Sequence, residues 1–333
     1  MDLKNKTILI TGGTGSFGKA FSAELLRKHK PKKIIIFSRD ELKQFEMMNQ
    51  DIYKKNRKIM RFLIGDVRDY KRLEFAMDQV DCVVHAAALK QVPTAEYNPG
   101  EFVKTNIIGA QNIIDASISS DVKKVIALST DKAAAPINLY GATKLCSDKL
   151  FISANNIIGN RQITFNVVRY GNVMGSRGSV IPFFQKLKKT DNFPITDIKM
   201  TRFNITMDKG IRLVLFALKN GKGGEIFISK IPSYKILDVA KAINPNCKIK
   251  IIGIRPGEKI HEEMITSSDS YSTYDLGNCY SIIDQSNHTL ANFYKKNKKF
   301  RKVPAGFTYN SFNNKDKLTV AELKTLIKKY LIS

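Results

Sequence analysis

A glycine-rich turn near the start of the chain limits the possible folds most strongly. The apolar run Thr7-Ile8-Leu9-Ile10 predicts a short buried strand, and Thr11-Gly12-Gly13-Thr14-Gly15-Ser16-Phe17-Gly18 follows it directly. A helix is expected over 19–28. Glycines at three-residue spacing permit a tight turn, and they let backbone N–H groups approach a pyrophosphate at the helix N-terminus. The stretch therefore predicts the opening strand, turn and helix of a dinucleotide-binding fold.

Alternating strands and helices continue to about residue 175. Further strands are expected at 33–37, 60–64, 80–85, 125–128 and 165–170, with helices that include 40–56 and 99–117. This alternation predicts an α/β fold with a Rossmann-type doubly wound parallel sheet. We assign residues 1–175 to this sheet domain and expect 206–230 to return to it. Residues 176–205 and 231–333 are expected to form a smaller C-terminal α/β substrate-binding domain, with a polar, irregular tail from Asp269 and a final helix over 319–331.

The end of the second strand bears on the choice of cofactor. Ser38-Arg39-Asp40 lies about 20 residues after the glycine-rich turn, where an acidic side chain would bind the ribose hydroxyl of NAD. The first charged side chain here is Arg39, which suits a 2′-phosphate. NADP is therefore favoured over NAD. The alternative is that Arg39 stacks on the adenine or faces water.

Other candidate cofactor contacts follow the later strands, because ligands of such sheets gather at the carboxyl edge. Asp66 could bind the adenine amino group, and the small residues Ala86 and Ala87 would let the backbone pass close to a cofactor. Lys90 could face cofactor or substrate phosphates. The full set of expected cofactor contacts is Gly12, Thr14, Gly15, Ser16, Phe17, Gly18, Ser38, Arg39, Asp40, Lys43, Asp66, Val67, Ala86, Ala87, Lys90, Thr105, Tyr140, Lys144 and Val173.

Charge and cysteine content bear on partners and location. The net charge of +25 could indicate a nucleic-acid partner, but the lysines are spread along the chain without an aromatic-basic motif. We expect the charge to steer an anionic small substrate, with neither nucleic acid nor membrane as a partner. Four scattered cysteines lack metal-ligand spacing, so no metal site is expected. With no apolar leader or long uncharged run visible, a cytoplasmic location is expected.

The stretch Ser129–Lys144 carries the candidate chemistry. Tyr140 and Lys144 are four residues apart on an expected helix and so share one face. A nearby ammonium would lower the pKa of the phenol towards a range useful for a general base. Thr130, Asp131 and Lys132 come directly after a strand, at the same edge of the sheet.

Together, the glycine-rich turn, Arg39, Thr130 and the Tyr140/Lys144 pair resemble the extended short-chain dehydrogenase/reductase superfamily. The resemblance implies that Thr130 and Tyr140 hold a substrate hydroxyl while the nicotinamide accepts a hydride. It also implies that Lys144 binds the nicotinamide ribose. This chain has Thr130-Asp131-Lys132 at the position where the sequence motif of the retaining 4,6-dehydratases resembles Thr-Asp-Glu. A lysine base must be partly neutral, and Asp131 must be partly protonated to act as an acid.

A wider set of motifs is similar to the inverting UDP-N-acetylglucosamine 4,6-dehydratases, which begin the bacterial pathway to pseudaminic acid and related L-sugars. The motifs lie at 11–19, 38–44, 65–69, 85–90, 128–134, 138–151, 169–180, 223–227 and 253–259. Gln91 and Asn204 depart from the family pattern, in which His and Trp are usual. The resemblance implies a homo-oligomer built from dimers, such as a hexamer. The substrate contacts that it implies are Lys90, Asn172, Arg177, Thr201, Arg255 and Glu258.

The resemblance implies a defined reaction on UDP-N-acetylglucosamine. Sugar C4 is oxidised as Tyr140 accepts the hydroxyl proton, Lys132 removes the C5 proton, and Asp131 protonates the leaving C6 hydroxyl. Hydride then returns to C6, and C5 is reprotonated on the opposite face. The guanidinium groups of Arg177 and Arg255 suit a diphosphate, although either could form a structural ion pair instead. The alternatives are a UDP-sugar 4-epimerase or retaining dehydratase on the same scaffold, and a non-enzymatic nucleotide- or nucleic-acid-binding protein.

Overall fold

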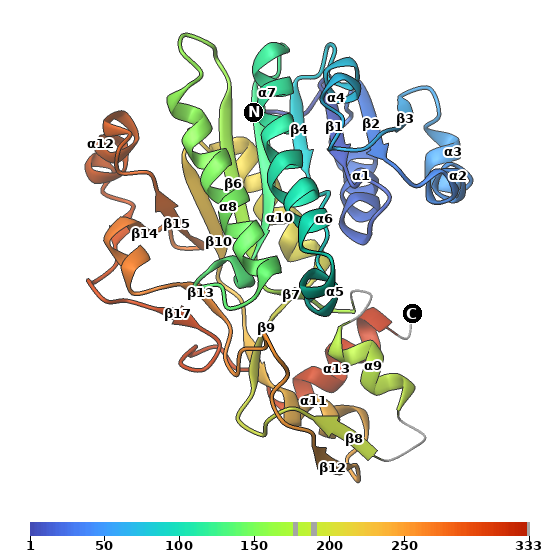
Figure 1. Cartoon of the computed structure of the whole chain (residues 1–333), viewed down its shortest axis with the longest axis vertical. Helices are drawn as coiled ribbons and strands as arrows, with labels where there is room; N and C mark the ends of the chain where they lie inside the picture. The colour runs from blue at the N-terminus through green and yellow to red at the C-terminus, as the bar shows by residue number, and fades with distance from the viewer. Residues whose placement is uncertain (176–178, 188–191, 332–333) are drawn as a thin grey trace.

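A large sheet forms the centre of the computed structural model, which describes residues 1–175, 179–187 and 192–331 (Figure 1). Its parallel strands are β1 (Thr7–Thr11), β2 (Lys33–Ser38), β3 (Met60–Ile64), β4 (Cys82–His85), β5 (Lys124–Thr130), β6 (Thr164–Tyr170) and β10 (Glu225–Ser229). From the edge inwards they run in the order β3-β2-β1-β4-β5-β6-β10. The first six strands have the Rossmann order. The predicted α/β fold is confirmed.

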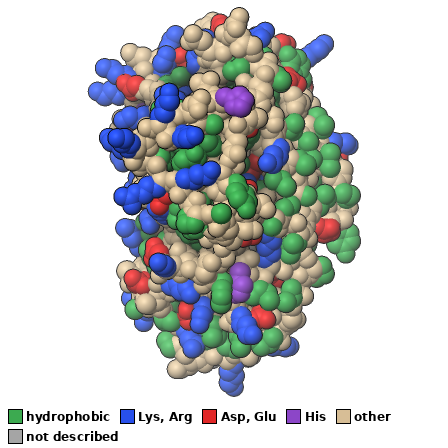
Figure 2. Space-filling view, turned by 90° about the vertical axis from the view of Figure 1, so that its left-hand side faces the viewer, with side chains coloured by type: hydrophobic (Ala, Val, Ile, Leu, Met, Phe, Trp, Pro, Cys, Tyr) green, Lys and Arg blue, Asp and Glu red, His purple; other side chains and the backbone are tan. Residues whose placement is uncertain are grey.

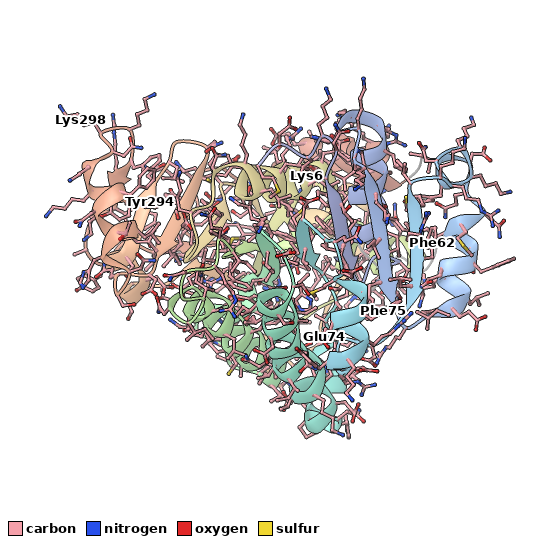
Figure 3. The ribbon with its side chains drawn as sticks, turned by 90° about the horizontal axis from the view of Figure 1, so that it is seen from above. Lys6, Phe62, Glu74, Phe75, Tyr294 and Lys298 are labelled. Carbon is pink, nitrogen blue, oxygen red and sulfur yellow. The ribbon has the colours of Figure 1, made fainter. Side chains whose placement is uncertain are left out.

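Helices cover both faces of this sheet, because the strands are apolar on both sides. One face packs against α1 (Ser16–Lys28) and α10 (Met207–Asn220), whose Phe21 and Val214 are fully buried with Ile10 of β1. The other face packs against α4 (Tyr70–Ala76), α7 (Gly109–Ser119) and α8 (Leu139–Ser153). Figures 1 and 3 show the sheet between the two layers.

Two expected helices are interrupted. The helix expected over 40–56 is divided into α2 (Glu41–Met48) and α3 (Asp51–Lys55), because the backbone at Gln50 is extended. The helix expected over 99–117 consists of α6 (Pro99–Phe102), the π-helical segment η1 (Val103–Ile108) and α7, and it follows the short α5 (Val92–Tyr97). Within η1, the Asn106 side chain accepts from the backbone N–H of Leu89 and donates to its carbonyl, each over 2.9 Å. The π segment thus fixes the loop after β4.

The prediction of an irregular tail from Asp269 is wrong for residues 273–302. Three antiparallel strands extend the sheet beside β10, namely β15 (Cys279–Ile283), β14 (Thr273–Asp275) and β16 (Arg301–Lys302). Helix α12 (His288–Lys296) packs on them through Leu290 and Tyr294. Figure 3 shows Tyr294 and Lys298 at this end, with Phe62 at the far end. These strands are short and separated by polar turns, which weakens their sequence pattern.

A smaller region lies beyond the carboxyl edge of the parallel strands (Figure 1). It contains the sheet of β7 (Asn172–Val173), β9 (Thr201–Ile205) and β11 (Ser233–Lys235), and the pair β8 (Asn192–Ile195) and β12 (Lys248–Ile251). Helices α9 (Val180–Lys186), α11 (Ile236–Ile243) and α13 (Val320–Leu331) enclose a separate apolar core with these strands. Strands β13 (Glu263–Ile265) and β17 (Tyr309–Asn310) pair nearby. The predicted limits of the two domains stay a prediction.

Charged side chains are distributed over the surface of the protein. Lysine and arginine side chains are spread over the face in Figure 2, among hydrophobic and other side chains. In the three ranges that the structure describes, no helix is long and apolar enough to cross a membrane.

Candidate active site

The carboxyl edge of the parallel strands lines a cavity of about 920 Å³. Every residue expected to contact a cofactor lies in its wall. The glycine-rich turn is shaped for close approach: Gly12 has a φ of 62°, and a Cβ added to Gly18 would lie 2.4 Å from the Gly13 carbonyl oxygen. The turn and α1 can therefore be in direct contact only with glycine at position 18. This bare backbone matches the cradle that a pyrophosphate requires.

Charged side chains surround one end of this first cavity. Arg39 Nη1 lies 3.5 Å from Asp66 Oδ2, and Arg68 Nη2 lies 2.7 Å from the same oxygen. Burial acts to raise the pKa of Asp66, but Arg68 more than offsets this effect and the pKa is lowered. Lys43 pairs with Asp40. Because the Arg39 side chain is 54% exposed, it remains accessible to an anionic group.

An unpaired hydroxyl lies in the wall of the same cavity. Thr105 Oγ1 is buried and has no hydrogen-bond partner among the residues that the structure describes. Buried polar atoms normally have partners, so an atom like this is a candidate ligand contact. Together with the glycine cradle and the basic side chains near Arg39, it fits a bound dinucleotide.

Tyr140 and Lys144 lie where expected, on the first turns of α8. The Asn138 side chain caps this helix, and a Cβ on Gly141 would meet the Lys132 carbonyl at 2.3 Å. Lys144 Nζ donates to the Leu128 carbonyl over 2.8 Å. The pKa of Tyr140 is nevertheless raised to about 12, because burial outweighs the neighbouring positive charge of Lys132. The expectation of a lowered phenol pKa is therefore wrong.

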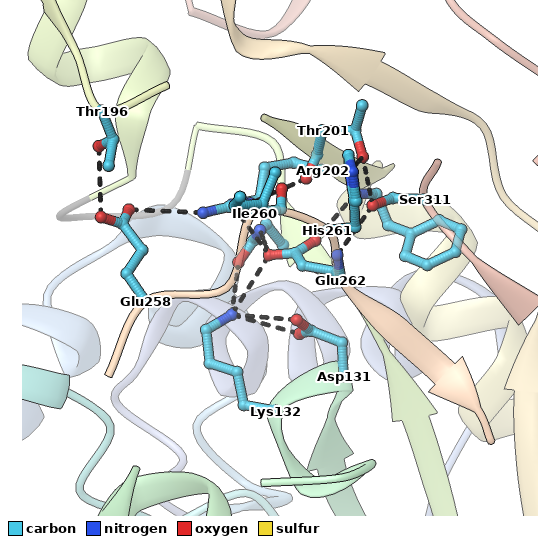
Figure 4. Close-up of polar contacts among 12 residues, drawn as sticks. Asp131, Lys132, Thr196, Thr201, Arg202, Glu258, Ile260, His261, Glu262 and Ser311 are labelled. Carbon is cyan, nitrogen blue, oxygen red and sulfur yellow. Dashed lines mark hydrogen bonds and ion pairs between the residues drawn. The ribbon is translucent and has the colours of Figure 1, made fainter. Parts of the chain in front are cut away.

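Lys132, which is half-buried, is at the centre of a polar cluster (Figure 4). Its Nζ lies 3.1 Å from Asp131 Oδ2, 3.3 Å from Asn172 Oδ1 and 3.5 Å from Glu262 Oε1. Thr130 Oγ1 donates to Asp131 Oδ1 over 2.9 Å. The two carboxylates are almost fully buried, at 2% and 3% exposure. Three candidate catalytic residues and Glu262 thus form one connected network.

The protonation of this cluster differs from the expectation. Burial acts to lower the pKa of Lys132, but the carboxylates of Asp131 and Glu262 more than offset this effect and raise it. Burial acts to raise the pKa of Asp131, yet Lys132 and Thr130 lower it overall. Both directions are opposite to the predictions of a partly neutral lysine and a partly protonated aspartate. Instead, burial and the Asp131 charge raise the pKa of Glu262.

A second cavity of about 550 Å³ adjoins the first and extends towards the smaller region. The residues in the walls of both cavities are Val92, Pro93, Lys132, Asn172, Val173, Ser179 and Arg255. Lys132 therefore lies at their junction. A nicotinamide ring in the first cavity and a sugar in the second would meet beside its ammonium.

Most expected substrate contacts line these cavities. Asn172 and Arg255 line both, Lys90 lines the first, and Glu258 lines the second, while Arg177 is outside the described residues. The exception is Thr201, which lines neither. Its hydroxyl bonds His261 Nδ1 over 2.9 Å and Ser311 Oγ over 2.7 Å. The two departures from the family pattern, Gln91 and Asn204, line the first and second cavity respectively.

Two residues of the site, Arg202 and Glu262, were not predicted from the sequence. Arg202 lines the second cavity and connects two acids, with Nε 3.3 Å from Glu262 Oε1 and Nη2 3.4 Å from Glu258 Oε1. Glu262 immediately precedes β13, whose Met264 and Ile265 are fully buried. A carboxylate beside a buried strand is the one sequence signal that could have identified it.

Comparison with known proteins identifies the family of the chain. Residues 8–284 match the family described as polysaccharide biosynthesis protein. The chain belongs to this family. Its relatives include the inverting UDP-N-acetylglucosamine 4,6-dehydratase of Campylobacter jejuni, which is 56% identical over 330 residues, 97% of each chain. The expected similarity to inverting dehydratases is confirmed.

Other proteins similar to this chain carry different descriptions. The UDP-glucose 4-epimerase of Rickettsia akari is 43% identical over 332 residues, 97% of this chain and 95% of the relative. The solved structure of Pen from Bacillus thuringiensis has a TM-score of 0.89 and 39% identity, and the match covers all of both chains. The fold is therefore shared along the whole chain, and the activity must be argued from the site.

Proposed function

We propose that the protein is an NADP-dependent UDP-N-acetylglucosamine 4,6-dehydratase that inverts C5. Its product would be UDP-2-acetamido-2,6-dideoxy-β-L-arabino-hex-4-ulose, which begins the route to pseudaminic acid or a related L-sugar. The observation that carries the proposal is the Asp131–Lys132 pair at the junction of the two cavities. The high identity to the Campylobacter jejuni dehydratase supports it.

The pair matters because dehydration needs chemistry that epimerisation does not. A 4-epimerase oxidises and re-reduces C4 and leaves C5 and C6 alone. A 4,6-dehydratase must also remove the C5 proton and protonate the C6 hydroxyl as it leaves. A lysine next to an aspartate supplies one base and one acid beside the same sugar.

In this proposal the cofactor, when bound, supplies the hydride acceptor and later the hydride donor. Tyr140 accepts the proton of the C4 hydroxyl, and Lys144, held by the Leu128 carbonyl, binds the ribose beneath it. Once C4 is a ketone, the C5 proton is acidic, and Lys132 removes it. Asp131 protonates the C6 hydroxyl, which leaves as water. Asn172 and Arg255 extend from this point along the second cavity, where the nucleotide would bind.

NADP is preferred over NAD because two cations lie where a 2′-phosphate would bind. Arg39 and Lys43 both line the end of the first cavity beside the β2 terminus. Guanidinium and ammonium groups are suited to phosphate oxygens. We further propose that the protein acts in the cytoplasm as a homo-oligomer, and light scattering of the purified protein would measure its mass.

Proton NMR of UDP-N-acetylglucosamine incubated with the protein in D₂O tests the proposal. The expected product has a new C6 methyl signal, deuterium at C5 and couplings of an L-arabino 4-keto sugar. A methyl product with D-xylo couplings would identify a retaining enzyme. Conversion to the galacto isomer without a methyl signal would identify an epimerase, the activity that the Rickettsia relatives' description names.

A further inference from the structure

The carboxylates beside Lys132 raise the pKa of its ammonium, so a base at this position needs a neighbouring group that can accept a proton. Two carboxylates contact the Lys132 ammonium, those of Asp131 and Glu262. In the proposed function, Asp131 already protonates the leaving C6 hydroxyl. Glu262 has no role there, although it lies in the same network (Figure 4).

Glu262 is held rigidly from both of its carboxylate oxygens. Oε1 accepts from Asn172 Nδ2 over 2.6 Å and lies 3.3 Å from Arg202 Nε, while Oε2 accepts from the backbone N–H of Phe203 over 2.9 Å. Its own backbone N–H donates to Ser311 Oγ over 2.9 Å. Such a carboxylate cannot turn away from Lys132 without breaking several hydrogen bonds.

We propose that Glu262 is a positioning residue that stores the proton exchanged between Lys132 and Asp131. The inference rests on the proposed function and deepens it. Lys132 passes one ammonium proton to the Glu262 carboxylate, which leaves a neutral amine and a carboxylic acid. The amine takes the C5 proton. The electron pair of the C5–H bond forms the C5–C6 double bond as the C6–O bond breaks.

The proton stored on Glu262 then completes the elimination. It passes through Asp131 to the departing C6 oxygen, which leaves as water. Lys132 ends as an ammonium with the former C5 proton, and both acids end as carboxylates. The elimination thus removes one water from the sugar and returns Lys132, Asp131 and Glu262 to their initial states, while Tyr140 still holds the proton of the C4 hydroxyl.

Three features favour Glu262 as the group that stores the proton. The Asp131 and Glu262 carboxyl groups face each other across the ammonium, and each perturbs the pKa of the other. Of the two, Glu262 has the raised pKa and Asp131 the lowered one, so Glu262 is the more basic acceptor. Both carboxylates are almost fully buried, which keeps the proton out of bulk water. The charged and titratable groups that act on Glu262 or are acted on by it are Asp131, Lys132, Arg202, Tyr234 and Lys259.

The test compares Glu262→Gln with Glu262→Asp and a neighbouring control. Glu262→Gln keeps the shape of the side chain but cannot hold the proton. Glu262→Asp keeps an acid. Glu263→Gln removes the next carboxylate along the strand, which is half-buried and acts on Lys259. For each purified full-length variant, the measurements are the rate of methyl-product formation against pH, the UDP affinity and the thermal melting temperature.

The expected result has three parts. Glu262→Gln lowers the dehydration rate by about 100-fold, the lower end for loss of a proton-transfer group, with UDP affinity unchanged. The unmodified protein loses rate as pH falls, because Glu262 must be ionised to accept the proton, and Glu262→Gln lacks this decline. Glu262→Asp recovers at least about tenfold over Glu262→Gln, since a carboxylate is restored, and Glu263→Gln behaves as the unmodified protein.

Different outcomes identify different failures. Full activity and an unchanged pH profile in Glu262→Gln would overturn the inference. So would equal losses in Glu262→Gln and Glu262→Asp at every pH, which indicate a structural role. If Glu262→Gln does not fold, the pH profile of Glu262→Asp is the test. The pH at which its dehydration rate declines must differ from that of the unmodified protein. An identical pH would overturn the inference. Absence of methyl product with the unmodified protein would instead refute the proposed function.

Discussion

The Lys132 ammonium donates to the Asp131 carboxylate over 3.1 Å, so two consecutive residues form an ion pair inside the site. Both residues belong to one short 3₁₀ turn, Asp131–Ala133, whose first backbone groups are capped by the Thr130 hydroxyl. The turn directs both side chains to the junction of the two cavities. The proposed base and acid are therefore placed by one local structure at the end of β5.

Replacement of Lys132 tests this pair directly. Lys132→Ala should lower dehydration by at least about 100-fold, because the C5 base is lost. The glycine cradle and Arg39 are untouched, so the cofactor content of the purified protein should not change. Methyl-product NMR and the nicotinamide content of the denatured protein measure the two quantities. Lys123→Ala, at an exposed position before β5, is the matched control. Normal turnover in Lys132→Ala would rule out the proposed role.

Cofactor preference should depend on Arg39. Arg39→Ala should weaken NADP binding by about tenfold or more, since a charge-assisted hydrogen bond contributes about 1.5–3 kcal/mol, and should leave NAD binding unchanged. Calorimetric titration of NADP and of NAD into the unmodified protein and into Arg39→Ala gives the ratio of the two cofactor affinities for each protein. Arg57→Ala removes the same charge from an exposed position outside the cavity and should change neither affinity. An equal loss for NAD and NADP would mean that Arg39 contacts the adenine instead.

Replacement of Thr105, whose hydroxyl has no partner among the described residues, should weaken cofactor binding without lowering the stability of the protein. Thr105→Val should leave the melting temperature unchanged or raise it, because a buried hydroxyl without a partner is replaced by a methyl group. Cofactor affinity should fall by about fivefold, the value of one hydrogen bond of about 1 kcal/mol. Thr164→Val is matched, since Thr164 Oγ1 also has no hydrogen-bond partner among the described residues but does not line the first cavity. Its cofactor affinity should not change.

Stability should depend on pH through Glu225. Burial raises the pKa of this carboxyl from 4.5 to about 7. Below pH 4.5 it is protonated in both folded and unfolded chains, and between 4.5 and 7 the unfolded chain loses the proton first. Stability should therefore fall across this window by about 3 kcal/mol and then level off.

Glu225→Gln should flatten that fall in stability, as measured by chemical unfolding at several pH values across the window. Glu24→Gln, which removes a carboxylate that pairs with Lys28 on the surface of α1, controls for the change in net charge. If Glu225→Gln keeps the full slope, another group is responsible for it.

The sequence patterns predicted the parallel sheet because its strands are continuous apolar runs, as in Ile34–Phe37. They also located Lys132 and Tyr140, which lie within one stretch and so keep their spacing in the fold. They failed where the outcome depends on contacts distant in sequence. The pattern around Thr201 does not indicate that its hydroxyl turns to Ser311, and Glu262 reaches Lys132 across 130 residues. The protonation of Lys132 depends on that distant carboxylate, so it could not be predicted locally.

The division of the site between early and late parts of the chain means that its two cavities depend on different segments. Among the described residues, the first cavity draws almost all of its wall from the first 173, with Ser179, Met207 and Arg255 as the later contributors. Glu262, Arg202 and Glu258 line the second cavity and come later in the chain. The Lys132 cluster is therefore complete only when segments up to 130 residues apart have packed together.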